Sequence, residues 1–383
     1  MKTAFILILG IAALVVNTYQ ATAADEPIDS RKLRELHQKV KAGQKLSPED
    51  QAYYDRGLVA RRKGEVGKPS GEPGSSPSAA TGTGKTSTGM VPLPDLTAEA
   101  RYKGEDGGLY GAGRNTPPEA HLKAALEIAG KIQPLDASGK PSPDGKIVFL
   151  THGMSNTTNE SERFIEVAAG DPRKNPALIL IDGAQGGMDS RKWVADTHTR
   201  RDTSPWVTLD KRVKAAGVTP QQVQVIWMKH ALARVAQYGE FPRHTKQLRD
   251  DTETIIHLLK DRFPNLKLVY LSSRSYAGYA SSELNPEPFA YESAFAVRSL
   301  IQDQIKGGGA LSYADGKAPL LLWGPYLWAD GEKGRKAGDL VYRREDFRED
   351  GTHPSDSGRQ KVAEQLLRFF TTDPTAAAWF MNH

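Results

Sequence analysis

The sequence predicts an α/β protein, in which a mainly parallel five-stranded sheet lies between two layers of helices. Short, continuous apolar runs recur past Ala120. Such runs are typical of strands that are buried on both faces of a parallel sheet. Helical patterns separate the runs, and an alternation of strands and helices favours a three-layer α/β/α sandwich with right-handed crossovers.

The first residues have the order of a secretory signal peptide. Lys2 supplies the charge, an apolar run extends from Ala4 to Val16, and the small residues Ala21-Thr22-Ala23 suit cleavage near Ala23. The run is shorter than the roughly 20 residues of a membrane span. We therefore expect a secreted or periplasmic protein whose mature chain has no membrane span, with a retained N-terminal anchor as the alternative.

Residues 24–63 predict a small helical hairpin. Two helical patterns, Arg31 to Ala42 and Pro48 to Lys63, are separated by a short polar stretch. Ser47 suits the cap of the second helix and Pro48 its first position, where the missing N–H is tolerated.

Residues 64–95 predict a low-complexity, flexible linker. Gly, Pro, Ser, Thr and Lys dominate its first part, and so few apolar residues cannot offset the entropy lost on ordering. Residues 96–145 are interpreted as an extension that packs on the sandwich, and residues 146–383 as the sandwich itself.

The strands are assigned to the apolar runs, and helices are expected around Glu160 to Ala169, over Asp250 to Phe263 and over Gln360 to Phe370. In an open parallel sheet, ligands bind beyond the carboxyl ends of the strands. The residues that follow each run are therefore the candidates for function. The five runs are Lys146 to Leu150, Ala177 to Ile181, Val223 to Trp227, Leu266 to Leu271 and Pro319 to Trp323.

Composition excludes several classes of function. The chain contains no cysteine, which removes disulfides and thiolate chemistry. Its net charge is +5, with acidic and basic residues interspersed, so no nucleic-acid partner is expected. A zinc hydrolase is disfavoured because the candidate histidines lack ligand spacing, and no metal or cofactor is expected. Those histidines are His152, His198, His230 and His353.

Ser155 lies in a small-residue turn between the first predicted strand and the next helix. A serine at a helix N-terminus beside glycine exposes its hydroxyl and lies close to backbone N–H groups that can hold an oxyanion. The alternative is that Ser155 only caps the helix.

Asp350 and His353 lie in the loop before the final helix, three residues apart. A carboxylate at this spacing can hold the imidazole Nδ1–H and leave Nε2 free to take a proton from a serine. The alternative is a pair of ordinary surface residues near a helix start. Both motif loops are predicted at the same edge of the sheet, which favours the catalytic interpretation.

Three sequence blocks resemble those of the SGNH (GDSL-like) hydrolase superfamily, in the family's order. They are Gly153-Met154-Ser155-Asn156, Gly183-Ala184-Gln185-Gly186-Gly187 and Asp350-Gly351-Thr352-His353-Pro354. The resemblance spans residues 146 to 370 and implies a flavodoxin-like sandwich. It also implies Ser155 as nucleophile, His353 as base and Asp350 as its orienting carboxylate.

The resemblance implies an oxyanion hole built from the N–H groups of Ser155 and of Gly186 or Gly187. The family's third donor, an asparagine after the third strand, is absent, because Trp227-Met228-Lys229-His230-Ala231 stands there. Lys229 or Asn156 is the expected replacement. A solvated lysine at a strand end and a plain glycine turn are the alternatives.

Two further loops are expected to border the crevice and to bind substrate. Rings beside an arginine suit a sugar or an acyl group, although aromatic clusters are as often ordinary packing. The candidates are Arg274, Tyr276, Trp323 and Tyr326.

The sequence therefore predicts a secreted serine esterase that acts on an acylated small molecule or carbohydrate, with carbohydrate deacetylation as one form. A catalytically silent glycan-binding or cell-surface module of the same fold is the alternative. The oligomeric state, the acyl group and the choice between hydrolysis and acyl transfer are not predicted.

Overall fold

The structure is a computed structural model that describes residues 28–29, 32–33, 36, 39–40, 44, 46–62, 84–195, 204–307 and 309–382. The chain divides into two compact units, Met1–Ala80 and Thr81–His383. The predicted signal peptide, residues 64–83 of the predicted linker and His198 lie outside the described residues.

The first unit contains helix α2, Pro48–Arg62, and helical residues within 32–40. Tyr53 and Tyr54 of α2 bury their rings against Leu33 and Leu36. A Cβ on Gly57 would approach Leu33 to 2.4 Å, so a glycine suits this close contact. The described part is thus consistent with a helical hairpin that has a small core of its own.

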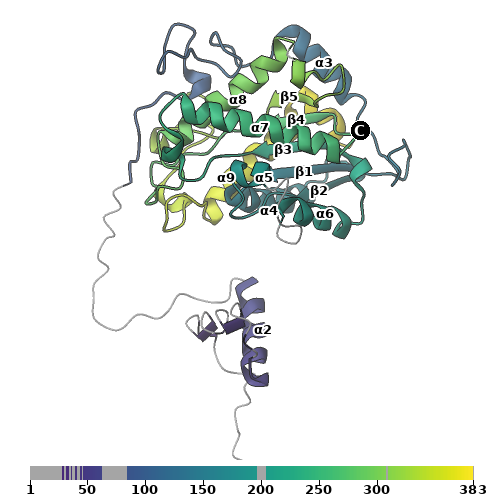
Figure 1. Ribbon diagram of the computed structural model, residues 1–383, viewed down its shortest axis with the longest axis vertical. Coiled ribbons are helices and arrows are strands. Elements are labelled where there is room, and N and C mark those ends of the chain that lie inside the picture. The colour runs from purple at the N-terminus through teal and green to yellow at the C-terminus, as the bar shows by residue number, and fades with distance from the viewer. Residues whose placement is uncertain are drawn as a thin grey trace, which may run out of the picture. The chain divides into compact units, whose positions relative to one another are not determined.

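Within the described residues of the second unit, five strands form one parallel sheet in the order β2-β1-β3-β4-β5 (Figure 1). Each strand begins within two residues of its predicted start, so the predicted sheet is confirmed. The order is that of the flavodoxin-like doubly wound fold. The strands are β1 Ile147–Gly153, β2 Leu178–Asp182, β3 Val223–Lys229, β4 Leu268–Leu271 and β5 Leu320–Trp323.

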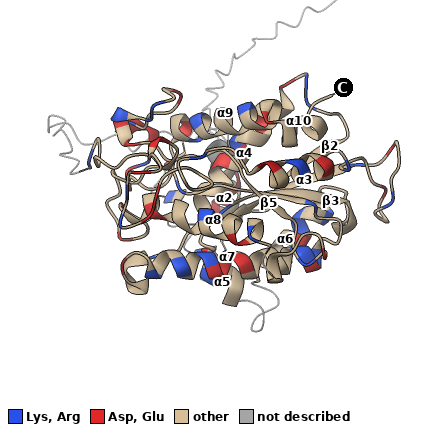
Figure 2. Cartoon of the chain, turned by 90° about the horizontal axis from the view of Figure 1, so that it is seen from above, with Lys and Arg blue, Asp and Glu red and all other residues tan. Residues whose placement is uncertain are grey.

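Helices cover both faces of the sheet and complete the predicted three layers (Figure 2). One layer holds α3 Glu119–Ala129, α4 Ser155–Ala169, α9 Asp356–Thr372 and α10 Pro374–Phe380. The other holds α5 Ser190–Ala195, α6 Pro205–Ala215, α7 Arg243–Arg262 and α8 Phe289–Ile305. Short 3₁₀ helices lie at Leu93–Asp95, Pro220–Gln222, Val235–Tyr238, Gly309–Leu311, Gly331–Lys333 and Arg344–Asp346.

The strand order determines where a crevice forms. After β1 the chain runs to β2 on one side, and β3 pairs with β1 on the other. The chain connections at β1 and at β3 therefore run to opposite sides of the sheet. Such a reversal opens a gap beyond the carboxyl ends of these two strands. Ser155 follows β1 directly and therefore lies at this switch point.

Residues 84–95 differ from the expectation of a flexible linker. The Asp330 carboxylate accepts hydrogen bonds from the Thr88 and Gly89 N–H groups (2.6 and 3.1 Å) and from the Ser87 hydroxyl (2.6 Å). Leu93 is fully buried. The low-complexity composition misled the prediction because one distant carboxylate, together with core contacts, holds the segment on the sandwich.

Acidic and basic side chains are interspersed over the outer helices, without a continuous basic face in the view of Figure 2. Among the described residues, no helix has both the length and the apolar character needed to cross a membrane.

Candidate active site

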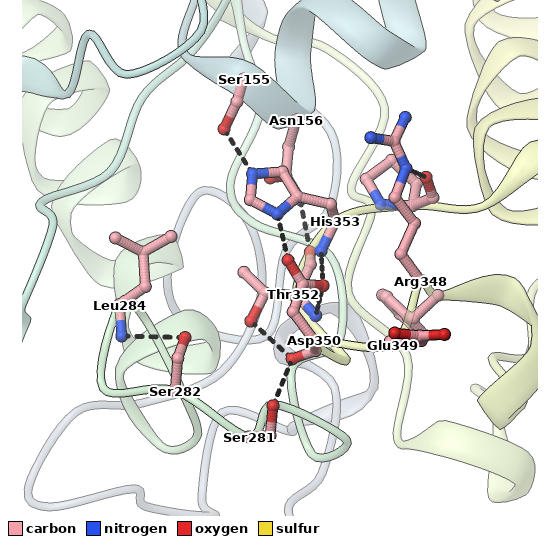
Figure 3. A network of polar contacts seen from close by, with 12 residues as sticks. Ser155, Asn156, Ser281, Ser282, Leu284, Arg348, Glu349, Asp350, Thr352 and His353 are labelled. Carbon is pink, nitrogen blue, oxygen red and sulfur yellow. Dashed lines mark hydrogen bonds and ion pairs between the residues drawn. The ribbon is translucent and has the colours of Figure 1, made fainter. Parts of the chain in front are cut away.

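Ser155 and His353 meet at the carboxyl edge of the sheet, although 198 positions separate them in sequence (Figure 3). Ser155 Oγ lies 2.8 Å from His353 Nε2. His353 Nδ1 lies 2.5 Å from Asp350 Oδ2. The three side chains form a continuous chain of hydrogen bonds, in which the carboxylate orients the ring and leaves Nε2 facing the hydroxyl.

Ser155 occupies the first position of α4, and Met154 is the N-cap residue. The alternative that Ser155 merely caps the helix is therefore wrong. Gly153 ends β1 opposite Lys229 of β3, and a Cβ there would come within 2.2 Å of the Lys229 carbonyl oxygen. The tight turn places the hydroxyl at the positive end of α4, where the first N–H groups lack partners within the helix.

The loop that carries His353 is shaped by Gly351 and Asp350. Gly351 has φ +61°, and a Cβ there would overlap the Tyr279 carbonyl oxygen at 1.7 Å, so the position requires glycine. Asp350 Oδ1 accepts the N–H groups of Thr352 and His353, both at 2.9 Å. Partial burial opposes ionisation of Asp350, but the hydrogen bonds from His353 and Thr352 outweigh it and lower the pKa of this carboxyl.

A cavity of about 140 Å³ lies beside Ser155. Its wall is apolar at Met154, Leu232, Ala233 and Leu284. Four of the remaining lining residues were predicted from the sequence as site residues, namely Ser155, Asn156, Gly187 and Arg274. The sequence did not predict Asp189, Lys192, Asn285 or Thr352.

Gly187 is the second-block glycine that reaches the cavity. Both glycines are exposed, but Gly186 is not among the described residues that line the cavity. Gly187 has φ +77°, which glycine adopts without strain. Of the two predicted donors from this turn, Gly187 is the one that lines the cavity beside Ser155.

Lys229 does not reach the cavity, and its predicted role as an oxyanion donor is wrong. Its ammonium group forms an ion pair with Glu160 of α4, and both side chains are fully buried. Burial lowers the pKa of Lys229 to about 8, against the opposing effect of Glu160. The lysine therefore satisfies a buried carboxylate in the interior.

Asn156 lines the cavity, but its amide has a different role from the predicted one. Asn156 Nδ2 donates to the Thr352 carbonyl oxygen at 2.8 Å. This bond joins the residue after the nucleophile to the residue before the base. Asn156 therefore positions the two catalytic loops relative to each other.

Tyr276, Trp323 and Tyr326 are buried and are not among the described residues that line the cavity, so their prediction as substrate-binding residues is wrong. The Tyr276 hydroxyl donates to the Lys85 carbonyl, and Trp323 Nε1 donates to the Leu109 carbonyl at 2.7 Å. The Tyr326 hydroxyl accepts the Leu93 N–H at 3.2 Å. All three side chains hold segments that precede the sandwich. They therefore have the packing role that was the alternative to substrate binding.

His152 and His230 form a buried pair behind the site. His152 Nδ1 lies 2.9 Å from His230 Nε2, and the His152 ring packs 4.0 Å from that of Trp193. Burial lowers the pKa of His230 to about 3. Within the described part of the chain, no group of three or more carboxylate or imidazole side chains is arranged to hold a metal ion.

Comparison with known proteins gives structural similarity without sequence similarity. No protein-family profile matches the chain, and no curated protein sequence matches it significantly. A Bacteroides fragilis protein named as an acylhydrolase is similar in structure, with 15% identity and a TM-score of 0.34, covering 66% of this chain and 96% of the other.

Two more solved structures are similar to the chain. A Parabacteroides merdae protein named as a GDSL-like lipase has 12% identity and a TM-score of 0.33, over 61% of this chain and 97% of its own. An α/β hydrolase from the Lake Arreo metagenome has 13% identity and a TM-score of 0.33, over 61% of this chain and 95% of its own.

Proposed function

We propose that the protein is a serine hydrolase that cleaves carboxylic esters through an acyl-enzyme. The observation that supports this most directly is the continuous hydrogen-bond chain from Ser155 through His353 to Asp350. The alternative of a silent binding module provides no reason for a serine hydroxyl and an oriented imidazole to meet at a cavity. The proposal therefore rests on the geometry of these three side chains.

In the first half of the proposed reaction, Ser155 Oγ attacks the ester carbonyl while His353 Nε2 takes its proton. Asp350 holds the ring and stabilises the imidazolium. The N–H groups of Ser155 and Gly187 would bind the oxyanion. His353 then passes the proton to the departing alcohol.

In the second half, water attacks the acyl-enzyme with His353 as base, releases the acid and restores Ser155. An acceptor alcohol in place of water would give acyl transfer with the same residues. The balance between the two outcomes depends on access to the acyl-enzyme.

The substrate class is proposed only as a small ester. The sequence suggested an acylated carbohydrate, including a substrate for deacetylation, because aromatic residues were expected beside the site. Tyr276, Trp323 and Tyr326 instead bind segments that precede the sandwich. A cavity of about 140 Å³ is close in size to one of roughly 150 Å³ that holds benzene, so a short acyl group or one end of a sugar fits.

A fluorophosphonate probe that reacts with activated serines tests the proposal. The wild-type protein should be labelled and should hydrolyse p-nitrophenyl acetate, and Ser155→Ala should do neither. Ser161→Ala is the matched control, because Ser161 is a buried serine on the same helix. Absence of labelling that depends on Ser155 would favour the binding module.

We also propose that the protein is exported, on the basis of its N-terminal sequence alone. Expression of the full chain in a secreting host should yield extracytoplasmic protein whose new N-terminus lies near Ala24. An uncleaved chain in the membrane fraction would favour the retained anchor.

A further inference from the structure

Arg274 is a buried cation on the wall of the Ser155 cavity. It follows β4, and its side chain is 1% exposed. Its Nε and Nη1 atoms have no hydrogen-bond partner among the described residues. A guanidinium keeps its proton in proteins, and leaving such a donor buried and unpaired costs free energy. Arg274 therefore combines a position on the cavity wall with two buried donors that have no partner.

The carboxylates near Arg274 are engaged with other groups. Glu160 pairs with Lys229. Glu287 accepts hydrogen bonds from two backbone N–H groups and from an indole N–H, and Asp350 orients the imidazole. Their charges raise the pKa of Arg274 through space, against the larger lowering effect of burial. None of the three forms an ion pair with Arg274.

The other charged groups that line the cavity are also engaged. The Asp189 carboxylate accepts the N–H groups of Lys192 (3.2 Å) and Ala233 (3.0 Å). Lys192 Nζ donates to the Gly187 carbonyl at 2.6 Å. Among the described lining residues, Arg274 is thus the cation that combines deep burial with unpaired donors.

We propose that the ester hydrolysed at Ser155 carries a carboxylate, and that Arg274 binds this group. The inference rests on the proposed function and names its substrate class. The planar fork of a guanidinium matches the two oxygens of a carboxylate. The apolar wall would hold the short chain between the carboxylate and the ester, in a cavity too small for a long acyl chain.

The carboxylate can lie on the acyl side or on the alcohol side of the ester, and two matched substrate pairs distinguish these. For the acyl side, p-nitrophenyl hemisuccinate is compared with p-nitrophenyl butyrate. For the alcohol side, an acetylated methyl glucuronoside is compared with the acetylated methyl glucoside. Wild type should favour the anionic member of one pair in kcat/KM by about 10- to 100-fold, as expected for hydrogen bonds to a charged group.

The preference should depend on Arg274. In Arg274→Gln the ratio of the two kcat/KM values should fall towards one, mainly through a higher KM for the anionic ester. Arg298→Gln is the matched control, because Arg298 is equally buried but pairs with Glu105 and Asp106. It should leave the ratio unchanged.

Two results would overturn the inference: no anionic preference in wild type, or a preference that persists in Arg274→Gln. If that variant does not fold, protection of wild-type Ser155 from the fluorophosphonate probe by succinate, but not by succinamide, decides the question. Equal protection by both would reject the role of Arg274.

Failure of the proposed function gives a different pattern. Wild type would then show neither labelling at Ser155 nor hydrolysis of any of the four esters. Thermal stabilisation by succinate would still report on Arg274: a shift in Tm that is present in wild type and lost in Arg274→Gln supports anion binding without catalysis. No shift in wild type would reject it.

Discussion

Asn156 Nδ2 donates to the carbonyl oxygen of Thr352 at 2.8 Å, and both residues are buried. The bond joins the helix start that carries the nucleophile to the loop that carries the base. Two segments far apart in sequence thereby keep the spacing that proton transfer requires. A displacement of about 1 Å in such a site can reduce the rate by roughly 100-fold.

Asn156→Ala should therefore lower kcat/KM for p-nitrophenyl acetate by about 10- to 100-fold, with a smaller loss of stability. Steady-state kinetics and thermal unfolding measure the two effects. Asn265→Ala is the control, because Asn265 Nδ2 also donates to a backbone carbonyl, that of Gln221 at 2.7 Å, and neither residue is among the described residues that line the cavity. An equal loss of activity in both variants would contradict a specific role for Asn156.

Asp350→Asn should reduce kcat by about 1,000- to 10,000-fold while the protein remains folded. The amide cannot stabilise the imidazolium, and it favours the wrong tautomer of His353. Single-turnover kinetics with p-nitrophenyl acetate measure the loss, and circular dichroism verifies the fold. Activity within tenfold of wild type would show that Asp350 is not the orienting group.

The buried pair of Lys229 and Glu160 should stabilise the fold without taking part in catalysis. Lys229→Met leaves a carboxylate buried and unpaired, which typically costs about 3 to 5 kcal/mol. Lys229→Met combined with Glu160→Leu should recover most of the free energy of unfolding, because it removes both charges. Denaturant unfolding of the single and double variants tests this, and equal stability of the two would contradict it.

Stability should fall in mild acid because of His152 and His230. Burial lowers the pKa of His230 to about 3, and burial together with the neighbouring His230 lowers the pKa of His152 well below its ordinary value. The unfolded chain binds protons at these rings near pH 6.5. The contribution of the two neutral rings to the free energy of unfolding is therefore fully present above that pH. It is lost as pH falls towards 3, by up to about 1.4 kcal/mol per pH unit for each ring.

Free energies of unfolding at pH 7.5, 6.5, 5.5 and 4.5 measure this slope. His230→Gln removes one titrating ring and keeps a polar partner for His152, so the slope below pH 6.5 should become shallower. An unchanged slope in the variant would mean that other groups control the acid response.

Asp330→Ala should release residues 84–95 from the sandwich. The Thr88 and Gly89 N–H groups lose their acceptor, at a cost of about 1 to 3 kcal/mol in local stability. Hydrogen exchange of peptides that cover this segment should become faster, whereas peptides from β1 should not change. Equal protection in both proteins would show that apolar contacts alone hold the segment.

Local sequence patterns were sufficient to predict the layered fold and the hydrogen-bonded chain of Ser155, His353 and Asp350. Apolar runs report burial on both faces, and the handedness of crossovers limits the topologies that such a sheet can have. The motif residues follow strand ends or precede a helix, so the topology alone brings them to one edge. The resemblance to SGNH hydrolases then supplied the roles of individual residues.

The tertiary structure decided which polar side chains are free. Lys229 ends β3 and Arg274 follows β4, and the sequence alone does not distinguish them. In the structure Glu160 pairs with Lys229, whereas two donor atoms of Arg274 have no described partner. The aromatic residues at the strand ends bind segments that precede the sandwich. Partners of this kind come from distant parts of the chain, and a side chain's availability depends on burial and distance, which no local pattern encodes.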